Sequence, residues 1–431
     1  MAKQQTNALS VSLRAKVSLW GRHVGDVTQY TNGRIGFSYA TDYLKDGVAL
    51  SPIHLPLDSR TFEFSGLVGF EAFMGLPGVI ADSLPDKFGN LIIKNYFDAK
   101  GEPDKALSPV QKLLYVGNRA MGGLEYAPHL QGKTPDDELA LEISALVTSA
   151  RRLIEGDTSE AINEIMRVGG SAGGARAKAL ILRNQELNHV KSGFAIPQKN
   201  DEHWLIKFDG VDSANHTDLN IRPYNRIEYT YALITAELDI DMAQADFIEE
   251  GNGLFHVMFK RFDREGAEKI HMHSLGGMTH VDYNRPQSYS YESWFRLILQ
   301  LGLGYQTLEQ AYRRMIFNIV GRNQDDHVKN ISFIMNEKDK TWKLSPAYDL
   351  TYANGSGFTL QHQMTIKGKA DNFDRNLLIE VGQDFDIKNP GAIIDETVGA
   401  FSRWPDLARK YGVPEQNVLS VNAAHRLYLG K

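Results

Sequence analysis

The sequence predicts an α+β fold in which two lobes follow a smaller N-terminal α/β subdomain. Its 431 residues exceed what one hydrophobic core usually organises, so several subdomains are expected. Strand patterns recur through the first 268 residues, whereas apolar residues at helical spacing dominate the rest. The polar segment 131–137 is the best linker candidate. We therefore expect an N-terminal subdomain over residues 1–135, a first lobe over 136–268 and a mainly helical second lobe over 269–431.

Composition and charge argue against several classes of protein. The 47 basic and 53 acidic side chains leave a net charge of −6, which argues against broad nonspecific adsorption to nucleic acid or membrane. The absence of cysteine excludes disulfides, thiolate metal sites and a cysteine nucleophile. The first seven residues lack the apolar core of a signal peptide, and no apolar run reaches the ~20 residues of a membrane span. We expect a soluble, cytoplasmic protein without a membrane partner.

The N-terminal third carries structural signals. Residues 17–25 have the alternation of a hairpin, and residues 34–39 continue a small sheet. Short helices punctuated by proline and glycine follow between residues 71 and 96. Asp82, Asp86 and Lys87 lie in this stretch, and we interpret them as helix caps or solvated residues and not as catalytic groups.

A glycine-rich segment, Gly169-Gly-Ser-Ala-Gly-Gly174, precedes an apparent strand over residues 179–182. Glycines let backbone amides approach phosphate oxygens without obstruction, and Lys178 could add positive charge. The segment does not fit the Walker pattern of glycine, four residues, glycine, lysine and serine or threonine. Because glycine clusters are common in ordinary linkers, a phosphate loop and a flexible linker are equal alternatives from this segment alone.

Lys207 interrupts a short apolar strand, His203-Trp-Leu-Ile-Lys-Phe208, and a helix begins after Pro223 with Glu228 near its start. In the N-terminal lobe of a protein kinase, a strand lysine grips the α- and β-phosphates of ATP and pairs with a glutamate of the following helix. We therefore predict an ion pair between Lys207 and Glu228. The ordinary alternative is a surface ion pair that contributes at most ~1 kcal/mol.

The next segment fits the hinge between two lobes. Leu254-Phe-His-Val-Met-Phe259 is typical of a buried strand, and the four residues after it would cross to the second lobe. Backbone groups of Lys260, Arg261 and Phe262 could bind adenine. Asp263 could reach a ribose hydroxyl, or it could cap a turn.

The strongest functional signal lies in the C-terminal half. Asp325 is followed five positions later by Asn330, which is the spacing of the base and the magnesium-binding amide in a kinase catalytic loop. Residues 330–344 fit a hairpin with its turn at 336–340. This hairpin would bring a second acid, Asp349, back beside Asn330.

These residue types suit transfer of a phosphoryl group from ATP. Asp325 would orient and deprotonate the attacking hydroxyl, while the oxygens of Asn330 and Asp349 suit Mg²⁺, which neutralises phosphate charge. Lys329 could add a cation near the transferring phosphate. For the triplet 325–327 alone, a helix cap in a solvated loop is the commoner role. The order of strand lysine, helix glutamate, hinge, catalytic loop and metal acid favours a bilobal protein-kinase-like fold.

The ordered motifs resemble the HipA family of bacterial serine/threonine kinases. Asp325-Asp-His-Val-Lys-Asn-Ile-Ser-Phe333 is similar to the Asp-x-His-x-Lys-Asn-Phe-Ser segment of that family. Residues 343–349 look like its metal-acid segment, residues 261–263 like its hinge and residues 205–207 like the segment with its ATP lysine. Residues 171–178 are similar to its glycine-rich loop, and Leu19-Trp20, residues 55–57 and residues 84–86 fit its N-terminal subdomain. The resemblance covers nearly the whole chain.

The resemblance implies roles for particular residues. The catalytic residues would be Asp325, Lys329 and Asn330. The ATP-binding residues would be Ser171, Ala172, Gly173, Gly174, Lys178, Lys207, Glu228, Lys260, Arg261, Phe262, Asp263, His327 and Asp349. Asn330 and Asp349 would bind Mg²⁺, and Ser171 would be an autophosphorylation site that switches the enzyme off.

The resemblance also implies a biological role and partners. The chain would be the toxin of a toxin–antitoxin pair, bound by a small helix-turn-helix antitoxin of the HipB type and, mainly through it, by operator DNA. Its substrate would be a serine of an aminoacyl-tRNA synthetase, with the glutamyl enzyme favoured, so that translation stops and persistence is promoted. A small-molecule kinase and a catalytically inactive corepressor that binds an antitoxin on DNA are the alternatives.

Two positions depart from the family pattern. Asp326 occupies a position often filled by a small residue, and Arg176-Ala177 replaces a Gln-Glu pair before Lys178. The first departure bears on the electrostatics of the site, and the second bears on how the loop holds phosphate. Neither departure removes an expected catalytic group.

Overall fold

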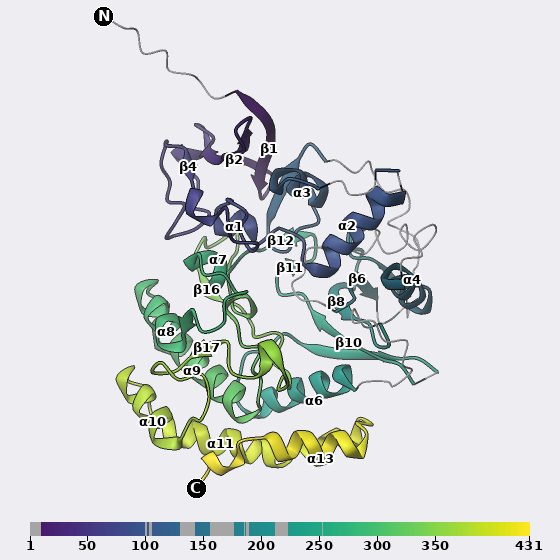
Figure 1. The fold of residues 1–431 in the computed structure, drawn as a ribbon, viewed down its shortest axis with the longest axis vertical. Helices are drawn as coiled ribbons and strands as arrows, with labels where there is room; N and C mark the ends of the chain where they lie inside the picture. The colour runs from purple at the N-terminus through teal and green to yellow at the C-terminus, as the bar shows by residue number, and fades with distance from the viewer. Residues whose placement is uncertain are drawn as a thin grey trace, which may run out of the picture.

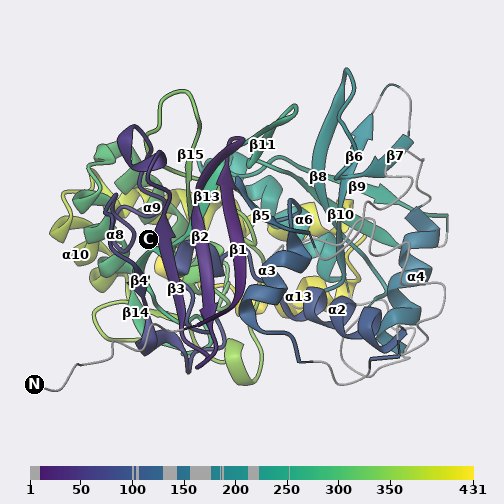
Figure 2. The ribbon, with the colours of Figure 1, turned by 90° about the horizontal axis from the view of Figure 1, so that it is seen from above.

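The computed structural model describes residues 10–99, 101–102, 106–129, 143–155, 176–184, 186, 189–211, 223–251 and 253–431. These residues form an N-terminal subdomain, a strand-rich lobe (the N-lobe) and a mainly helical lobe (the C-lobe) (Figure 1). Figure 2 shows the N-terminal sheet over the C-lobe, with the N-lobe sheet beside it. The predicted α+β architecture is confirmed.

The N-terminal subdomain is built on an antiparallel sheet in the order β4-β3-β2-β1-β5. Its strands are β1 (Val11–Leu19), β2 (Arg22–Tyr30), β3 (Ile35–Tyr39), β4 (Phe62–Glu63) and β5 (Leu124–Ala127). Between β4 and β5 lie the helices α1 (Gly78–Ala81), α2 (Lys87–Ala99) and α3 (Pro109–Val116). Alternation along β1 buries Ala15, Val17 and Leu19. The hairpin and third strand predicted from the sequence are confirmed.

The N-lobe contains an antiparallel sheet in the order β7-β6-β8-β10-β9. Its elements are α4 (Ile143–Glu155), β6 (Lys178–Asn184), β7 (His189–Ser192), β8 (Asp201–Lys207), α6 (Tyr224–Glu237), β9 (Ala245–Glu249) and β10 (Phe255–Lys260). Helix α6 begins directly after Pro223, as predicted. Strand β8 pairs with β10 so that Lys207 lies opposite Val257.

Helix α2 packs on the N-lobe although it lies within the predicted N-terminal subdomain. Its Phe88 and Ile92 share a hydrophobic core with Leu146 of α4 and with Trp204 and Ile206 of β8. The two units are therefore joined through a common core. The linker predicted from the sequence lies outside the described residues, and the domain boundaries stay predictions.

The C-lobe is built around α9, whose Met315, Ile316 and Ile319 are fully buried. Its helices are α7 (Leu275–Thr279), α8 (Tyr291–Gln300), α9 (Gly304–Val320), α10 (Arg375–Asp384), α11 (Pro390–Ser402), α12 (Trp404–Lys410) and α13 (Glu415–Ala424). A sheet in the order β13-β15-β16 joins the strands β13 (His271–Ser274), β15 (Ser332–Met335) and β16 (Lys343–Leu344). The hairpin of β15 and β16 is the one predicted before Asp349.

Short elements complete the described chain. The two-stranded pairs are β11 (Arg264–Glu265) with β12 (Glu268–Lys269), and β14 (Tyr289–Ser290) with β17 (Met364–Thr365). The 3₁₀ helices are η1 (Tyr43–Lys45), η2 (Ser65–Leu67), η3 (Val328–Asn330), η4 (Gly357–Thr359) and η5 (Leu427–Leu429). Among the described helices, none has the length and apolar character needed to cross a membrane.

Candidate active site

Lys207, the last residue of β8, contacts both lobes. Its ammonium donates a hydrogen bond of 2.5 Å to Glu228 Oε1 of α6 and a second one to Asp349 Oδ1 of the C-lobe. The predicted contact between Lys207 and Glu228 is therefore present. It is also buried, because the Glu228 side chain is 1% exposed. The pair is thus not the surface ion pair that was the ordinary alternative.

Asn225 fixes α6 against the N-lobe sheet. Its Nδ2 donates hydrogen bonds to the backbone carbonyls of Lys207 at 3.0 Å and of Phe255 at 2.9 Å. Sequence analysis missed this residue. Its position three residues before Glu228, which puts both side chains on one helix face, was the signal that could have found it.

Asp349 and Lys207 stabilise each other's charge. Burial alone would raise the pKa of Asp349. The Lys207 ammonium nevertheless holds this pKa below its usual value. Burial likewise opposes the charge of Lys207, but the carboxylates of Asp349 and Glu228 raise its pKa. Asp349 has a φ of +53°, a left-handed conformation that aspartate adopts more readily than most residues. Asn323 Nδ2 donates to the Asp349 carbonyl at 3.3 Å and supports that conformation.

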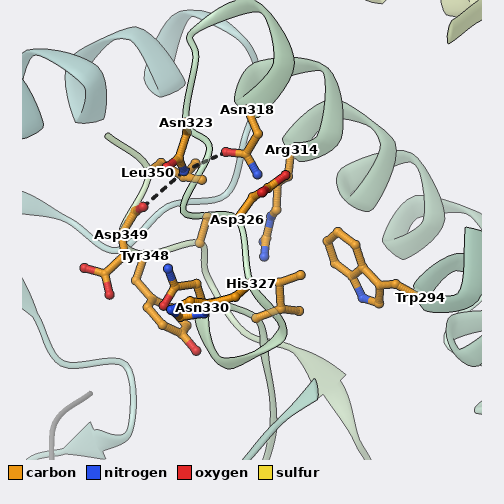
Figure 3. A pocket seen from close by; sticks show the side chains of 12 residues that line it. Trp294, Arg314, Asn318, Asn323, Asp326, His327, Asn330, Tyr348, Asp349 and Leu350 are labelled. Atoms are coloured by element: carbon orange, nitrogen blue, oxygen red, sulfur yellow. Dashed lines mark hydrogen bonds between the residues drawn. The ribbon is translucent and has the colours of Figure 1, made fainter. Parts of the chain in front are cut away.

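Asn330 is oriented by the backbone of its own loop. Its Nδ2 donates to the Asp325 carbonyl at 3.0 Å, so Oδ1 is the atom of this amide that can bind a cation. Figure 3 shows Asn330 and Asp349 on one side of a pocket and Trp294 on the opposite side. The hairpin of β15 and β16 therefore brings together two residues that are 19 positions apart by their numbers.

Asp325 lies in the same loop with an accessible carboxylate. Its side chain is 48% exposed, and His327 Nε2 lies 3.8 Å from its Oδ1. The side chain is only partly exposed, and its partial burial raises the pKa of Asp325; His327 opposes this rise, and the Asp349 carboxylate adds to it. An accessible carboxylate with a raised pKa is suited to accept a proton.

Lys329 and Lys178 both contact the N-terminal subdomain. Lys329 Nζ donates to Asp82 Oδ1 at 2.6 Å, and Lys178 Nζ lies 2.6 Å from Asp86 Oδ2. The interpretation of the two acids as caps or solvated residues is therefore incomplete. Asp86 does accept from the Gly89 amide at the start of α2 at 2.6 Å, but both carboxylates are largely buried and paired with lysines.

The side chain of Asp263 is not where the sequence interpretation placed it. It is fully buried and accepts hydrogen bonds from Arg261 at 2.7 and 2.8 Å, from Arg264 at 2.8 Å and from the Gly122 amide at 2.7 Å. The expectation that Asp263 contacts a ribose hydroxyl is therefore wrong, because these protein donors already occupy both carboxylate oxygens. Asp263 instead ties the hinge to the N-terminal subdomain.

The backbone of the hinge is also partly engaged. The Lys260 amide donates to the Gln244 carbonyl at 2.8 Å, and the Arg261 amide donates to the His203 carbonyl at 2.9 Å. These two amides are not available to a purine, so an adenine contact at these positions would have to use their carbonyls. The contact expected of Phe262 stays a prediction.

Arg176 is the first described residue after the glycine-rich segment. Outside the described residues lie Ser171, Ala172, Gly173 and Gly174. Arg176 Nη1 donates to Glu228 Oε2 at 3.3 Å, and Nη2 donates to Asn225 Oδ1. Arg176 therefore contacts the Glu228 oxygen that Lys207 leaves open.

Asp326, the departure noted beside Asp325, is a buried anchor. It accepts hydrogen bonds from the Tyr291 hydroxyl at 2.6 Å, from His362 Nδ1 at 2.8 Å and from the Gln363 amide at 2.7 Å. Arg426 donates to His362 Nε2 at 2.9 Å, which requires a neutral imidazole with its proton on Nδ1. Asp326 thus joins the catalytic loop to the segment at 362–363.

Replacing Asp326 by alanine should destabilise the protein strongly. The change would leave three buried donors without an acceptor, and each unsatisfied donor costs ~1–3 kcal/mol. We expect the free energy of unfolding to fall by about 3 kcal/mol or more, measured by urea denaturation. Asp325→Ala is the matched control at the adjacent, half-exposed position and should cost less than ~1 kcal/mol. Equal losses in the two variants would contradict the anchor role.

The fold and these contacts define a class of protein. A strand lysine paired with a helix glutamate is followed, in protein-kinase order, by a hinge, by Asp325 and Asn330, and by Asp349. The chain therefore has a kinase-like bilobal fold with an added N-terminal subdomain. It belongs to the HipA family, because residues 170–416 match the HipA-like C-terminal domain and residues 15–127 match the HipA N-terminal domain.

Individual relatives agree with this class. The chain is 25% identical over 358 residues to the putative kinase Y4mE of Sinorhizobium fredii, covering 78% of this chain and 76% of the relative. It is 28% identical over 166 residues to a putative kinase of Haemophilus influenzae, covering 34% of this chain and 48% of that relative. A chain in the solved complex of HipA, HipB and operator DNA from Shewanella oneidensis MR-1 has the same fold, with a TM-score of 0.64, 15% identity and 96% of each chain covered.

Proposed function

We propose that this protein is an ATP- and Mg²⁺-dependent serine/threonine protein kinase that acts as the toxin of a toxin–antitoxin pair. The observation that carries the proposal is the position of Lys207, which contacts Glu228 of α6 and Asp349 of the C-lobe at once. This places a cation where the two lobes meet, the region in which protein kinases hold the phosphates of ATP. Relatives described as putative kinases support the same class.

Each residue of the site has a role in this proposal. Lys207 would hold the α- and β-phosphates of ATP, with Glu228 keeping its ammonium in place. The Asn330 Oδ1 and the Asp349 carboxylate are hard oxygen donors that fit Mg²⁺, and kinase magnesium sites use few protein ligands besides phosphate oxygens and water. When bound, Mg²⁺ supplies neutralisation of the charge on the phosphate oxygens. Asp325 would take the proton of the attacking hydroxyl.

The proposed partners follow from the family. The Shewanella complex contains HipA, HipB and operator DNA, so we propose a small helix-turn-helix antitoxin for this chain and contact with operator DNA mainly through that antitoxin. The protein substrate would be an aminoacyl-tRNA synthetase, with the glutamyl enzyme favoured. Phosphorylation of a serine in this enzyme would stop translation and promote persistence.

Phosphopeptide mass spectrometry after brief expression tests the substrate. We expect a new phosphoserine on a translation enzyme in cells that express the wild type, and none in cells that express Asp325→Ala. A phosphorylated metabolite without a new phosphopeptide would favour a small-molecule kinase. Identical patterns in the two cultures would favour an inactive corepressor.

Ser171 is the proposed autophosphorylation site. A phosphate there adds about −1.5 to −2 charges at pH 7, which would repel the phosphates of ATP and lower ATP affinity. Intact-mass analysis after incubation with ATP should show one added phosphate on the wild type and none on Ser171→Ala or Asp325→Ala. The proposal fails if Ser171→Ala gains the same phosphate, or if fully Ser171-phosphorylated protein keeps its kinase activity.

A further inference from the structure

The connection between α1 and α2 contacts both lobes. It runs from Asp82, the residue after α1, to Asp86, the residue before α2. Lys329 of the C-lobe donates to Asp82 Oδ1 at 2.6 Å, and Lys178 of β6 lies 2.6 Å from Asp86 Oδ2. Figure 1 shows α1 next to α7 of the C-lobe and α2 next to β6 of the N-lobe. One short connection therefore binds a lysine from each lobe.

Asp82 is held in one orientation by the C-lobe. Its Oδ2 accepts from His273 Nδ1 and from the Ser274 amide, both at 2.8 Å, and its Oδ1 accepts from the Ser274 hydroxyl at 2.6 Å. Helix α1 also approaches α7 backbone to backbone, since a Cβ on Gly78 would lie 1.9 Å from a carbonyl oxygen of α7. Asp82 therefore gives Lys329 an acceptor that three other hydrogen bonds orient.

Asp86 is held in a similar way. The Gly89 amide donates to its Oδ1 at 2.6 Å, and Pro85 restricts the preceding backbone. Its side chain is 8% exposed and that of Lys178 is 7% exposed. Burial raises the pKa of Asp86 and lowers the pKa of Lys178. Because the cost of desolvating both charges offsets their attraction, a buried ion pair of this kind contributes little net stability. Its main effect is to fix the positions of the two side chains.

Each lysine is next to a residue of the candidate active site. Lys178 pairs in register with Lys207, whose ammonium contacts Asp349. Lys329 directly precedes Asn330 in the catalytic loop. A lysine side chain without a fixed partner loses up to ~2 kcal/mol of rotamer entropy when it is ordered, and the two carboxylates remove that cost from the reaction.

We propose that Asp82 and Asp86 are positioning residues for phosphotransfer, which hold Lys329 and Lys178 in place and make the N-terminal subdomain a working part of the active site. This inference rests on the proposed kinase function and deepens it. The ordinary alternative is that the two ion pairs only attach the N-terminal subdomain to the lobes.

A double-mutant cycle on the full chain separates the two roles. The variants are Asp82→Asn, Lys329→Met and their combination, and the measured quantities are kcat and the KM for ATP. A lysine displaced by about 1 Å can cost up to ~10²-fold in rate, so we expect Asp82→Asn to lower kcat by about tenfold or more while KM changes by less than about threefold. If Asp82 acts through Lys329, the double variant should be no slower than Lys329→Met. The proposal would be overturned if the loss of kcat in the double variant equalled the product of the losses in the two single variants. It would also be overturned if folded Asp82→Asn kept the kcat of the wild type.

Asp86 and Lys178 allow a second, independent double-mutant cycle. This cycle decides the proposal if Asp82→Asn does not fold. We expect Asp86→Asn and Lys178→Met to raise the KM for ATP by similar factors, and the double variant to add nothing further. An unchanged KM in folded Asp86→Asn, or factors that multiply, would contradict the positioning role.

A matched control is available in the same subdomain. Asp46→Asn breaks an exposed ion pair of 2.6 Å with Arg22 that lies outside the site, so it should leave kcat and KM unchanged. Wild-type activity is measured first. No phosphate transfer by the wild type would refute the proposed kinase function, whereas an active wild type with an equally active Asp82→Asn would refute only the positioning role.

Discussion

Asp325→Ala should lower the rate of phosphotransfer by about 10²-fold to 10⁴-fold, the range for a positioned general base, and should leave the fold intact. The Asp325 side chain is 48% exposed, and His327 Nε2 lies 3.8 Å from its Oδ1, beyond hydrogen-bond distance, so removing the carboxylate breaks no close hydrogen bond. Asn330 donates to the backbone carbonyl of residue 325, which alanine retains. The magnesium-binding amide should therefore keep its orientation. Steady-state kinetics with ATP and a protein acceptor measure the effect.

Asp325→Asn is the matched control for shape. The amide has nearly the same size as the carboxylate but cannot accept the proton, so we expect a loss close to that of alanine. A folded Asp325→Ala protein that works within about threefold of the wild type would rule out Asp325 as the general base.

Asp349→Asn should weaken Mg²⁺ dependence and nucleotide binding together. A neutral amide is a poorer ligand for a hard cation than a carboxylate. The change also removes the ion pair that places the Lys207 ammonium. Hydrogen bonds to charged groups contribute ~1.5–3 kcal/mol, which corresponds to about tenfold or more in the Kd for ATP with Mg²⁺.

Calorimetry of ATP binding with and without Mg²⁺ compares this variant with Asp325→Ala. We expect Asp325→Ala to bind nucleotide like the wild type, because it removes the base and not a ligand. An Asp349→Asn protein with unchanged affinity and unchanged Mg²⁺ dependence would refute the assignment of Asp349 as a metal ligand.

The part of the site that could be predicted from the sequence consists of residues that lie close together in the chain or in motifs that follow one another in a known order. Asp325 and Asn330 are five positions apart, and the hairpin before Asp349 has a clear turn. The Lys207 and Glu228 pair followed from one strand and the helix after it. Each of these contacts depends on local structure that a few neighbouring residues determine.

The contacts that were missed join residues far apart in the chain. Asp82 and Lys329 are 247 positions apart, and their partnership depends on how α1 packs on α7. An isolated aspartate has the same sequence signature whether it caps a helix, faces solvent or pairs with a buried lysine. Asp263 illustrates the same limit, since its hinge position suggested ribose although its donors come from the hinge and from Gly122.

The packing of α2 has a similar cause. Its apolar face predicts burial, but the residues that cover this face come from the N-lobe and not from the N-terminal sheet. Periodicity identifies the face of a helix that is buried, whereas the partner is decided by the tertiary fold. The shared core could therefore not be predicted from the pattern of α2 alone.

Transfer of the γ-phosphate of ATP to protein tests the proposed kinase function most directly. Purified wild type and Asp325→Ala are incubated with γ-labelled ATP and a heat-treated cell lysate, in which the endogenous kinases are inactive, with and without Mg²⁺. We expect Mg²⁺-dependent label on serine or threonine with the wild type and at least about 10²-fold less with the variant. The absence of Mg²⁺-dependent labelling of protein by folded wild type, or equal labelling by the two proteins, would contradict the proposal.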